Sequence, residues 1–260
     1  MSAGLALGAS GFFAWAALAD GLLGWGGVAG LGILCARAAA AGESNDPSAL
    51  HLTLLLFSLS LLPRLFPADL PPWPWKVLLP LLAYLGLAAC VPRLRRSWHW
   101  LRPGRLGARE ALFAGGLAAA GALGAGVWAA LAAPDLAPYR RSLPALAPWL
   151  VAPAGAGFAL LNAAMEEAVF RGAILGALER CLRHPSAALG LQALLFGVLH
   201  YREGFPSGVS GVALTAVYGL GLGVLRGLSG GLAAPWLAHA GADAAVYALV
   251  VRSARVAGGG

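Results

Sequence analysis

The chain has 260 residues, of which 59% are hydrophobic and 11% are charged. A soluble protein carries roughly a quarter charged residues, so this composition excludes a soluble globular protein and predicts a polytopic membrane protein. The net charge of +7 comes from arginines beside the apolar runs. We therefore interpret them as topology signals and expect no nucleic-acid partner. The three cysteines lie far apart in the sequence, which suggests neither a disulfide framework nor a Cys-x-x-Cys metal site.

Eight apolar stretches reach or approach the length needed to cross a bilayer as a helix, which is about 20 residues. The first stretch has no positively charged region before it, because the first basic residue is Arg37. A secretory signal peptide needs such a region, so we expect a retained span. In chain order, the expected spans are residues 12–34, 50–66, 77–91, 111–133, 149–178, 187–200, 209–225 and 232–251.

These spans predict an all-α fold: a polytopic transmembrane helix bundle of about eight helices, some of them short or broken around a buried polar cavity. The connections at residues 42–48, 67–75 and 134–144 are polar or proline-rich, and none is long enough for a soluble domain. The connection at residues 93–109 contains six arginines, which predicts that it is cytoplasmic. Alternation from this connection places both termini outside.

The fifth span contains ionisable side chains at a depth where each costs at least about 2.5–3.5 kcal/mol, which indicates a functional site. Glu167 and Arg171 are four residues apart, with the acid on the N-terminal side, so they can form a helical ion pair. Glu166 is rotated about 100° from Glu167. It is either a protonated acid or a base held by groups on another helix. The alternative is an ion-pair patch at the end of the helix.

Two histidines lie in the last spans, each four residues from a second side chain on the same helix face. Phe196 precedes His200, and His239 precedes Asp243. Taken alone, His200 is typical of a core histidine bonded to a carbonyl, and the His239–Asp243 pair could hold the bundle together. Together with the glutamates, these groups predict a convergent hydrolytic site with a general base, an orienting imidazole and groups that hold an oxyanion.

With these residues the chain resembles the CPBP family of intramembrane proteases (CAAX protease and bacteriocin-processing), also called type II CAAX prenyl endopeptidases or the abortive-infection family. The family motifs are Glu-Glu-x-x-x-Arg, Phe-x-x-x-His and His-x-x-x-Asn/Asp, in this order. Here they run from Glu166 to Arg171, from Phe196 to His200 and from His239 to Asp243. The resemblance divides the chain into N-terminal transmembrane helices without a recognised motif, residues 1–148, and a CPBP-like catalytic core, residues 149–252.

The resemblance implies an intramembrane endopeptidase whose catalytic set is Glu166, Glu167, His200, His239 and Asp243. The first glutamate and the first histidine would activate water, and His239 with its partner would stabilise the tetrahedral intermediate. Asparagine at the last position can donate a hydrogen bond to an oxyanion, whereas an ionised Asp243 cannot. Asp243 is therefore expected either to be protonated or only to orient His239.

No cofactor is favoured by this sequence. Glutamate and histidine suit zinc, but the chain has no His-Glu-x-x-His motif. If zinc is present, its ligands would be Glu166, His200 and His239. The expected partners are the lipid bilayer and a membrane-associated peptide or protein substrate.

Four other classes of protein are weaker alternatives. A rhomboid-like serine protease would use Ser210 in the sequence GVSG with His239 as its base, which leaves Glu166 unexplained. A presenilin-like protease needs two deep aspartates, and only Asp243 fits. A proton-coupled transporter would use Glu166 and the histidines as a relay, but the two halves show no inverted repeat. A catalytically idle interaction or immunity protein would use these polar groups only for packing.

The abundance of Ala, Gly, Arg and Leu is typical of a GC-rich bacterial genome, which predicts a multi-pass protein of the bacterial inner membrane. Eukaryotic relatives trim prenylated C-termini. Bacterial CPBP proteins without prenylated partners are thought to process peptides, anchors or sorting signals, and we expect a substrate of this second kind.

Overall fold

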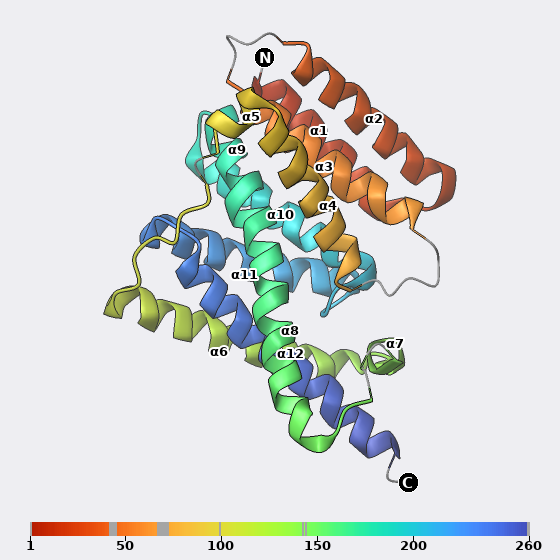
Figure 1. Ribbon diagram of the computed structural model, residues 1–260. Helices are drawn as coiled ribbons and strands as arrows, with labels where there is room; N and C mark the ends of the chain where they lie inside the picture. The colour runs from red at the N-terminus through yellow and green to blue at the C-terminus, as the bar shows by residue number, and fades with distance from the viewer. Residues whose placement is uncertain are drawn as a thin grey trace. The chain divides into compact units, whose positions relative to one another are not determined.

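The structure is a computed structural model that describes residues 2–41, 46–66, 73–98, 100–141, 143 and 145–258. The predicted connections at residues 42–48 and 67–75 lie largely outside these residues. Within the described ranges every regular element is a helix, which confirms the all-α prediction. The helices are α1 (Ser2–Leu18), α2 (Gly21–Ala39), α3 (Ser48–Leu65), α4 (Trp75–Cys90), α5 (Pro92–Arg96), α6 (Ala108–Ala132), α7 (Ala137–Arg141), α8 (Pro148–Glu167), the π-helix η1 (Ala168–Ile174), α9 (Leu175–Cys181), α10 (Pro185–Glu203), α11 (Gly208–Ser229) and α12 (Ala233–Gly258) (Figure 1).

Six helical segments in the described part of the chain are long and apolar enough to cross a membrane. They are α2, α3, α6, the continuous run from Pro148 to Cys181, α11, and α12 as far as Ser253. Two of the predicted spans correspond to helices outside this set: α4 is apolar but shorter, and α10 does not meet the same criteria. The protein is thus a multi-pass integral membrane protein, and its described residues contain the mixture of long and shorter helices that the sequence predicts.

The chain forms two compact units, which are described separately. Unit 1 contains Met1–Arg102 and Met165–Val224, and unit 2 contains Pro103–Ala164 and Leu225–Gly260. The division by motif content at residue 148 is a different partition of the chain and stays a prediction.

The predicted first span, residues 12–34, is wrong, because the chain reverses in the middle of it. Helix α1 ends at Leu18 and α2 begins at Gly21, and the two helices pack against each other (Figure 1). They run antiparallel, since Gly8 lies against Leu34 whereas Gly27 lies against Ala16. A run of apolar residues therefore forms a helical hairpin in place of a single span.

The reversal depends on the residues at the tip of the hairpin. Gly21 has a φ of +51°, a left-handed conformation that favours glycine. Arg202 forms an ion pair with Asp20 and donates hydrogen bonds to the carbonyl oxygens of Ala17 and Leu18 at 2.8 and 2.6 Å. The hydrogen bond from Arg202 lowers the pKa of the Asp20 carboxyl below its usual value. The last carbonyl groups of α1 have no hydrogen-bond donor within the helix, and the guanidinium of Arg202 supplies that donor.

Helix α3 forms the centre of unit 1, where it packs against α1, α2, α4, η1 and α9. Leu52, Leu55 and Leu56 are fully buried in this core. The buried His51 is hydrogen-bonded through Nδ1 to the hydroxyl of Tyr84 and through Nε2 to the hydroxyl of Ser97, both at 2.8 Å. This buried histidine links α3, α4 and the end of α5, a network that the sequence patterns do not predict.

In unit 2, helix α12 packs along α6 (Figure 1). Aromatic side chains make two of its contacts with α8. Trp236 donates its indole N–H to the carbonyl oxygen of Leu160 at 2.9 Å. The rings of Phe158 and Tyr247 lie 5.8 Å apart. These contacts fix the register of the two helices that carry the polar residues of this unit.

The hairpin changes the expected position of the N-terminus. If the arginine-rich connection at residues 93–109 is cytoplasmic, counting back through α4, α3, α2 and α1 places the start of α1 in the cytoplasm also. A reporter fused to the N-terminus should therefore give a cytoplasmic signal, as should one inserted in that connection. If the N-terminal fusion and the connection give signals from opposite sides of the membrane, the hairpin is not a pair of crossing helices.

Candidate active site

The first motif lies where an α-helix widens into a π-helix. Glu166 and Glu167 end α8, and Arg171 is in the middle of η1. Wide turns of this kind are rare and are frequent at functional sites. Nη1 of Arg171 lies 2.9 Å from Oε1 of Glu167, and the two side chains are 0% and 1% exposed. The predicted ion pair is therefore present, and it is buried.

Described groups from α8, α10 and α11 contact the guanidinium of Arg171. Besides Glu167, its Nη2 donates a hydrogen bond to the carbonyl oxygen of Gly219 on α11 at 3.3 Å. Its Cζ atom lies 4.3 Å from the centroid of the Phe196 ring, which is a cation–π distance. A Cβ atom at Gly219 would lie 2.8 Å from Cδ1 of Phe196 and 3.1 Å from Nη2 of Arg171. Glycine is thus required at this position for the close approach of α11.

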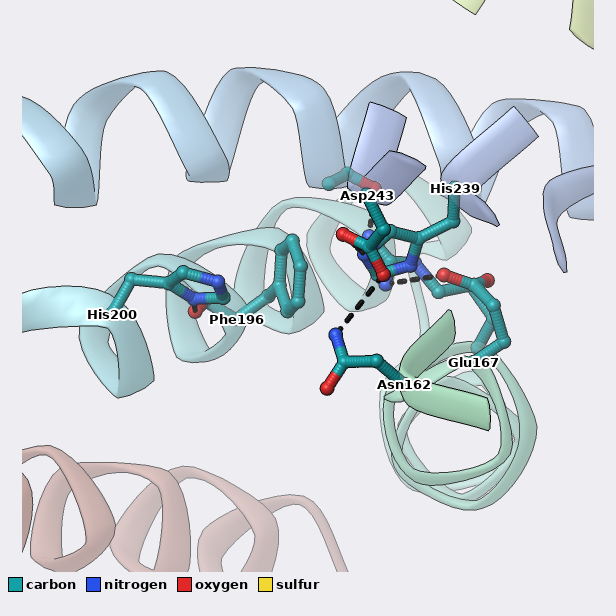
Figure 2. Close-up of polar contacts among 8 residues, drawn as sticks. Asn162, Glu167, Phe196, His200, His239 and Asp243 are labelled. Carbon is teal, nitrogen blue, oxygen red and sulfur yellow. Dashed lines mark hydrogen bonds and ion pairs between the residues drawn. The ribbon is translucent and has the colours of Figure 1, made fainter. Parts of the chain in front are cut away.

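The second motif joins the first through Phe196. Its ring packs edge-on against Phe170, with centroids 5.0 Å apart, and against the imidazole of His200 at 4.7 Å. Nδ1 of His200 lies 2.9 Å from the carbonyl oxygen of Phe196 (Figure 2). A carbonyl oxygen can only accept, so Nδ1 carries the proton, and in the neutral ring Nε2 is the basic nitrogen. The carbonyl bond expected of a core histidine is present, and it leaves the imidazole in a tautomer suited to accept a proton.

The third motif belongs to unit 2. His239 and Asp243 lie on α12, and Nε2 of His239 is 3.7 Å from Oδ1 of Asp243. This distance is beyond hydrogen-bond range. The other carboxylate oxygen, Oδ2, accepts a hydrogen bond from Nδ2 of Asn162 at 3.0 Å (Figure 2).

The structure thus places the predicted site residues in two sets. Unit 1 brings the first two motifs together: the Glu167–Arg171 pair contacts Phe196, and Phe196 contacts His200. Glu166, which is 8% exposed, precedes this cluster on α8. Unit 2 brings His239 and Asp243 together. The convergence of the two sets in one hydrolytic site stays a prediction.

Sequence reasoning missed Asn162 as a member of the site. Two signals were available: it is a polar residue in an apolar stretch at bilayer depth, and it precedes Glu166 by four residues. Neither signal identifies Asp243 as its partner, because Asp243 is on a different helix and 81 positions further along the chain.

Within either unit, the described residues do not make a zinc site. A catalytic zinc takes three protein ligands. Of the predicted ligand set, unit 1 contains Glu166 and His200, and unit 2 contains His239. Among the described residues, neither unit groups three His, Cys, Asp or Glu side chains in a way that could hold a metal ion. The zinc-dependent alternative therefore stays a prediction.

The fold and these side chains define a polytopic membrane protein with buried acid–base groups in its apolar helices. Residues 148–245 match a family model described as Rce1-like, type II CAAX prenyl endopeptidase Rce1-like. The matched segment contains all three motifs, and the match confirms the resemblance over this part of the chain. It implies an intramembrane endopeptidase of the CAAX type. No curated protein and no solved structure matches the chain.

The close packing around Arg171 predicts how a larger side chain at Gly219 affects the stability of the protein. Gly219→Ala should destabilise the protein by about 1–3 kcal/mol, the usual cost of overpacking, because its Cβ atom would press on Phe196 and Arg171. Thermal unfolding in detergent measures this effect. Gly227→Ala on the same helix is the control, since its Cβ atom would meet nothing within 4 Å. Equal unfolding temperatures for the two variants would contradict the described packing.

Proposed function

We propose that the protein hydrolyses peptide bonds of membrane-associated substrates by means of water activated by Glu166 and His200. Glu166 accepts a proton from the water molecule as the water oxygen attacks the scissile carbonyl carbon. The proton then passes to the amine nitrogen as the C–N bond breaks. His200 orients the water through Nε2. Reactions of this type gain about 10²–10⁴-fold from general acid–base catalysis.

The observation that carries this proposal is the buried Glu167–Arg171 ion pair at 2.9 Å. The pair commits Glu167 to neutralising a fully buried guanidinium, a task that leaves no role for it as a base. The chemistry is therefore assigned to Glu166, the neighbouring glutamate on a different face of the helix. The tautomer of His200 supports the proposal independently, because Nδ1 is held by the carbonyl of Phe196.

His239 and Asp243 are assigned the second task of the reaction, which is to stabilise the oxyanion of the tetrahedral intermediate. Donors aimed at such an oxyanion are each worth about 10²–10³ in kcat. In the described geometry Asp243 faces His239 with one oxygen and accepts from Asn162 with the other. At 3.7 Å the carboxylate acts on His239 by ion-pair attraction and without a hydrogen bond, which favours Asp243 as the group that orients this histidine. The donor to the oxyanion is then the protonated imidazole, which has an N–H for each of the two partners.

The substrate class follows from the location of the site in a multi-pass membrane protein. The proposed substrates are membrane-associated peptides or proteins, and the proposed location is the bacterial inner membrane. The matched family model is named after prenyl-CAAX cleavage. A panel of prenylated and unmodified membrane-tethered peptides therefore distinguishes a CAAX substrate from another kind of anchor or peptide.

The two glutamates should respond differently to substitution. Glu166→Ala and His200→Ala should fold normally and lose on the order of a hundredfold or more in kcat, because each removes a general-base contribution. Glu167→Ala and Arg171→Ala should lower the folded yield, because each leaves a buried charge without its ion-pair partner. Cleavage of a membrane-tethered peptide is measured per folded protein. If Glu166→Ala is active, and folded Glu167→Ala is inactive, the two roles are reversed.

Two controls separate this mechanism from its alternatives. Ser210 lies exposed at the start of α11, and Ser210→Ala should leave cleavage unchanged. A chelator should also leave cleavage unchanged, whereas a loss that zinc restores would favour a metal-dependent protease. The proposed function fails if the purified protein cleaves no membrane-tethered peptide and instead moves protons or solute in liposomes.

A further inference from the structure

The hydrogen bond between Asn162 and Asp243 is a contact between two apolar helices of unit 2. Nδ2 of Asn162 on α8 donates to Oδ2 of Asp243 on α12 at 3.0 Å. Both side chains are partly buried. Polar side chains in membrane helices are costly unless they are paired, and such pairs often mark functional positions. In the sequence, Asn162 precedes Glu166 by four residues, and Asp243 follows His239 by four residues.

The chemistry of the two partners assigns them different roles. A carboxylate has only acceptor oxygens, whereas an amide nitrogen has two N–H donors. Asn162 therefore supplies the donor of this pair, and Asp243 supplies the acceptor. With Oδ2 held by the amide, the carboxylate presents Oδ1 to Nε2 of His239 at 3.7 Å (Figure 2).

The packing of unit 2 holds Asn162 in this position. On one side of it along α8, the Phe158 ring packs against Tyr247 of α12. The carbonyl of Leu160 accepts the indole N–H of Trp236. These contacts restrict the sliding of α8 along α12, so the amide is directed at one carboxylate oxygen. A geometry held to within about half an ångström is what a positioned catalytic group requires.

We propose that Asn162 is a positioning residue of the oxyanion-stabilising pair: its amide fixes the orientation of the Asp243 carboxylate, and the carboxylate in turn orients the imidazole of His239. This inference rests on the proposed function, because it assigns a role within that reaction. Asn162 acts through Asp243 and makes no contact with the reacting atoms. Its loss should therefore lower kcat and leave KM largely unchanged.

A reciprocal exchange of the two side chains tests this proposal. Asn162→Asp places an acceptor opposite an acceptor, and kcat per folded protein should fall by about tenfold or more, which is the value of a lost hydrogen bond to a charged group. Adding Asp243→Asn to this variant restores a donor–acceptor pair, and most of the lost activity should return. Asp243→Asn alone is measured beside the double variant, so that the effect of the second substitution by itself is known. A merely structural residue would show no such rescue of kcat.

Two further variants keep the test decisive. Asn162→Ala removes the donor without adding a charge, so it covers the case in which Asn162→Asp does not fold, and it should also lower kcat about tenfold. Leu161→Ala is the control, because this neighbouring side chain on α8 is 43% exposed. If the wild-type protein cleaves the peptide and folded Asn162→Ala matches Leu161→Ala in kcat, the inference is wrong and the proposed function stands. If the wild-type protein cleaves nothing, the proposed function itself is wrong.

Discussion

The guanidinium of Arg171 has no exposure to solvent, although it lies within a chain that crosses a lipid bilayer. An unpaired charge in this environment costs several kcal/mol. In unit 1 the guanidinium contacts one carboxylate, one carbonyl and one aromatic face, contributed by Glu167, Gly219 and Phe196. The relative positions of η1, α10 and α11 thus depend on the neutralisation of one cation.

This constraint gives a physical reason for the spacing within the motifs. Arg171 follows Glu167 by four residues, so the pair closes along one face of the chain even where the helix widens. Phe196 has two functions, since its ring packs on Arg171 and its carbonyl fixes the proton of His200 four residues later. The same spacing places Asp243 beside His239. The first two motifs therefore combine residues that hold the helices together with residues that take part in the proposed chemistry. The buried ion pair of Glu167 and Arg171 holds the neighbouring side chains in position.

The sequence predicts the helical fold and most of the helices to within a few residues, because most of the apolar runs coincide with one helix. It is wrong about residues 12–34, where Asp20 and Gly21 reverse the chain. Their effect depends on Arg202, which is more than 180 positions away in the sequence. Within the site, the Glu167–Arg171 contact follows from helical periodicity alone. The contacts of Asn162 and Gly219 do not, because each partner lies on another helix and the register between helices is set by packing.

The central claim is that Glu167 neutralises Arg171 while Glu166 acts on the water molecule. The most direct test is a crystal structure of the Glu166→Gln variant with a membrane-tethered peptide bound. The account predicts an intact ion pair between Glu167 and Arg171, and a water molecule held between the Gln side chain at position 166 and Nε2 of His200, facing the scissile carbonyl. A water molecule held by Glu167, with Arg171 turned away from it, would contradict the account.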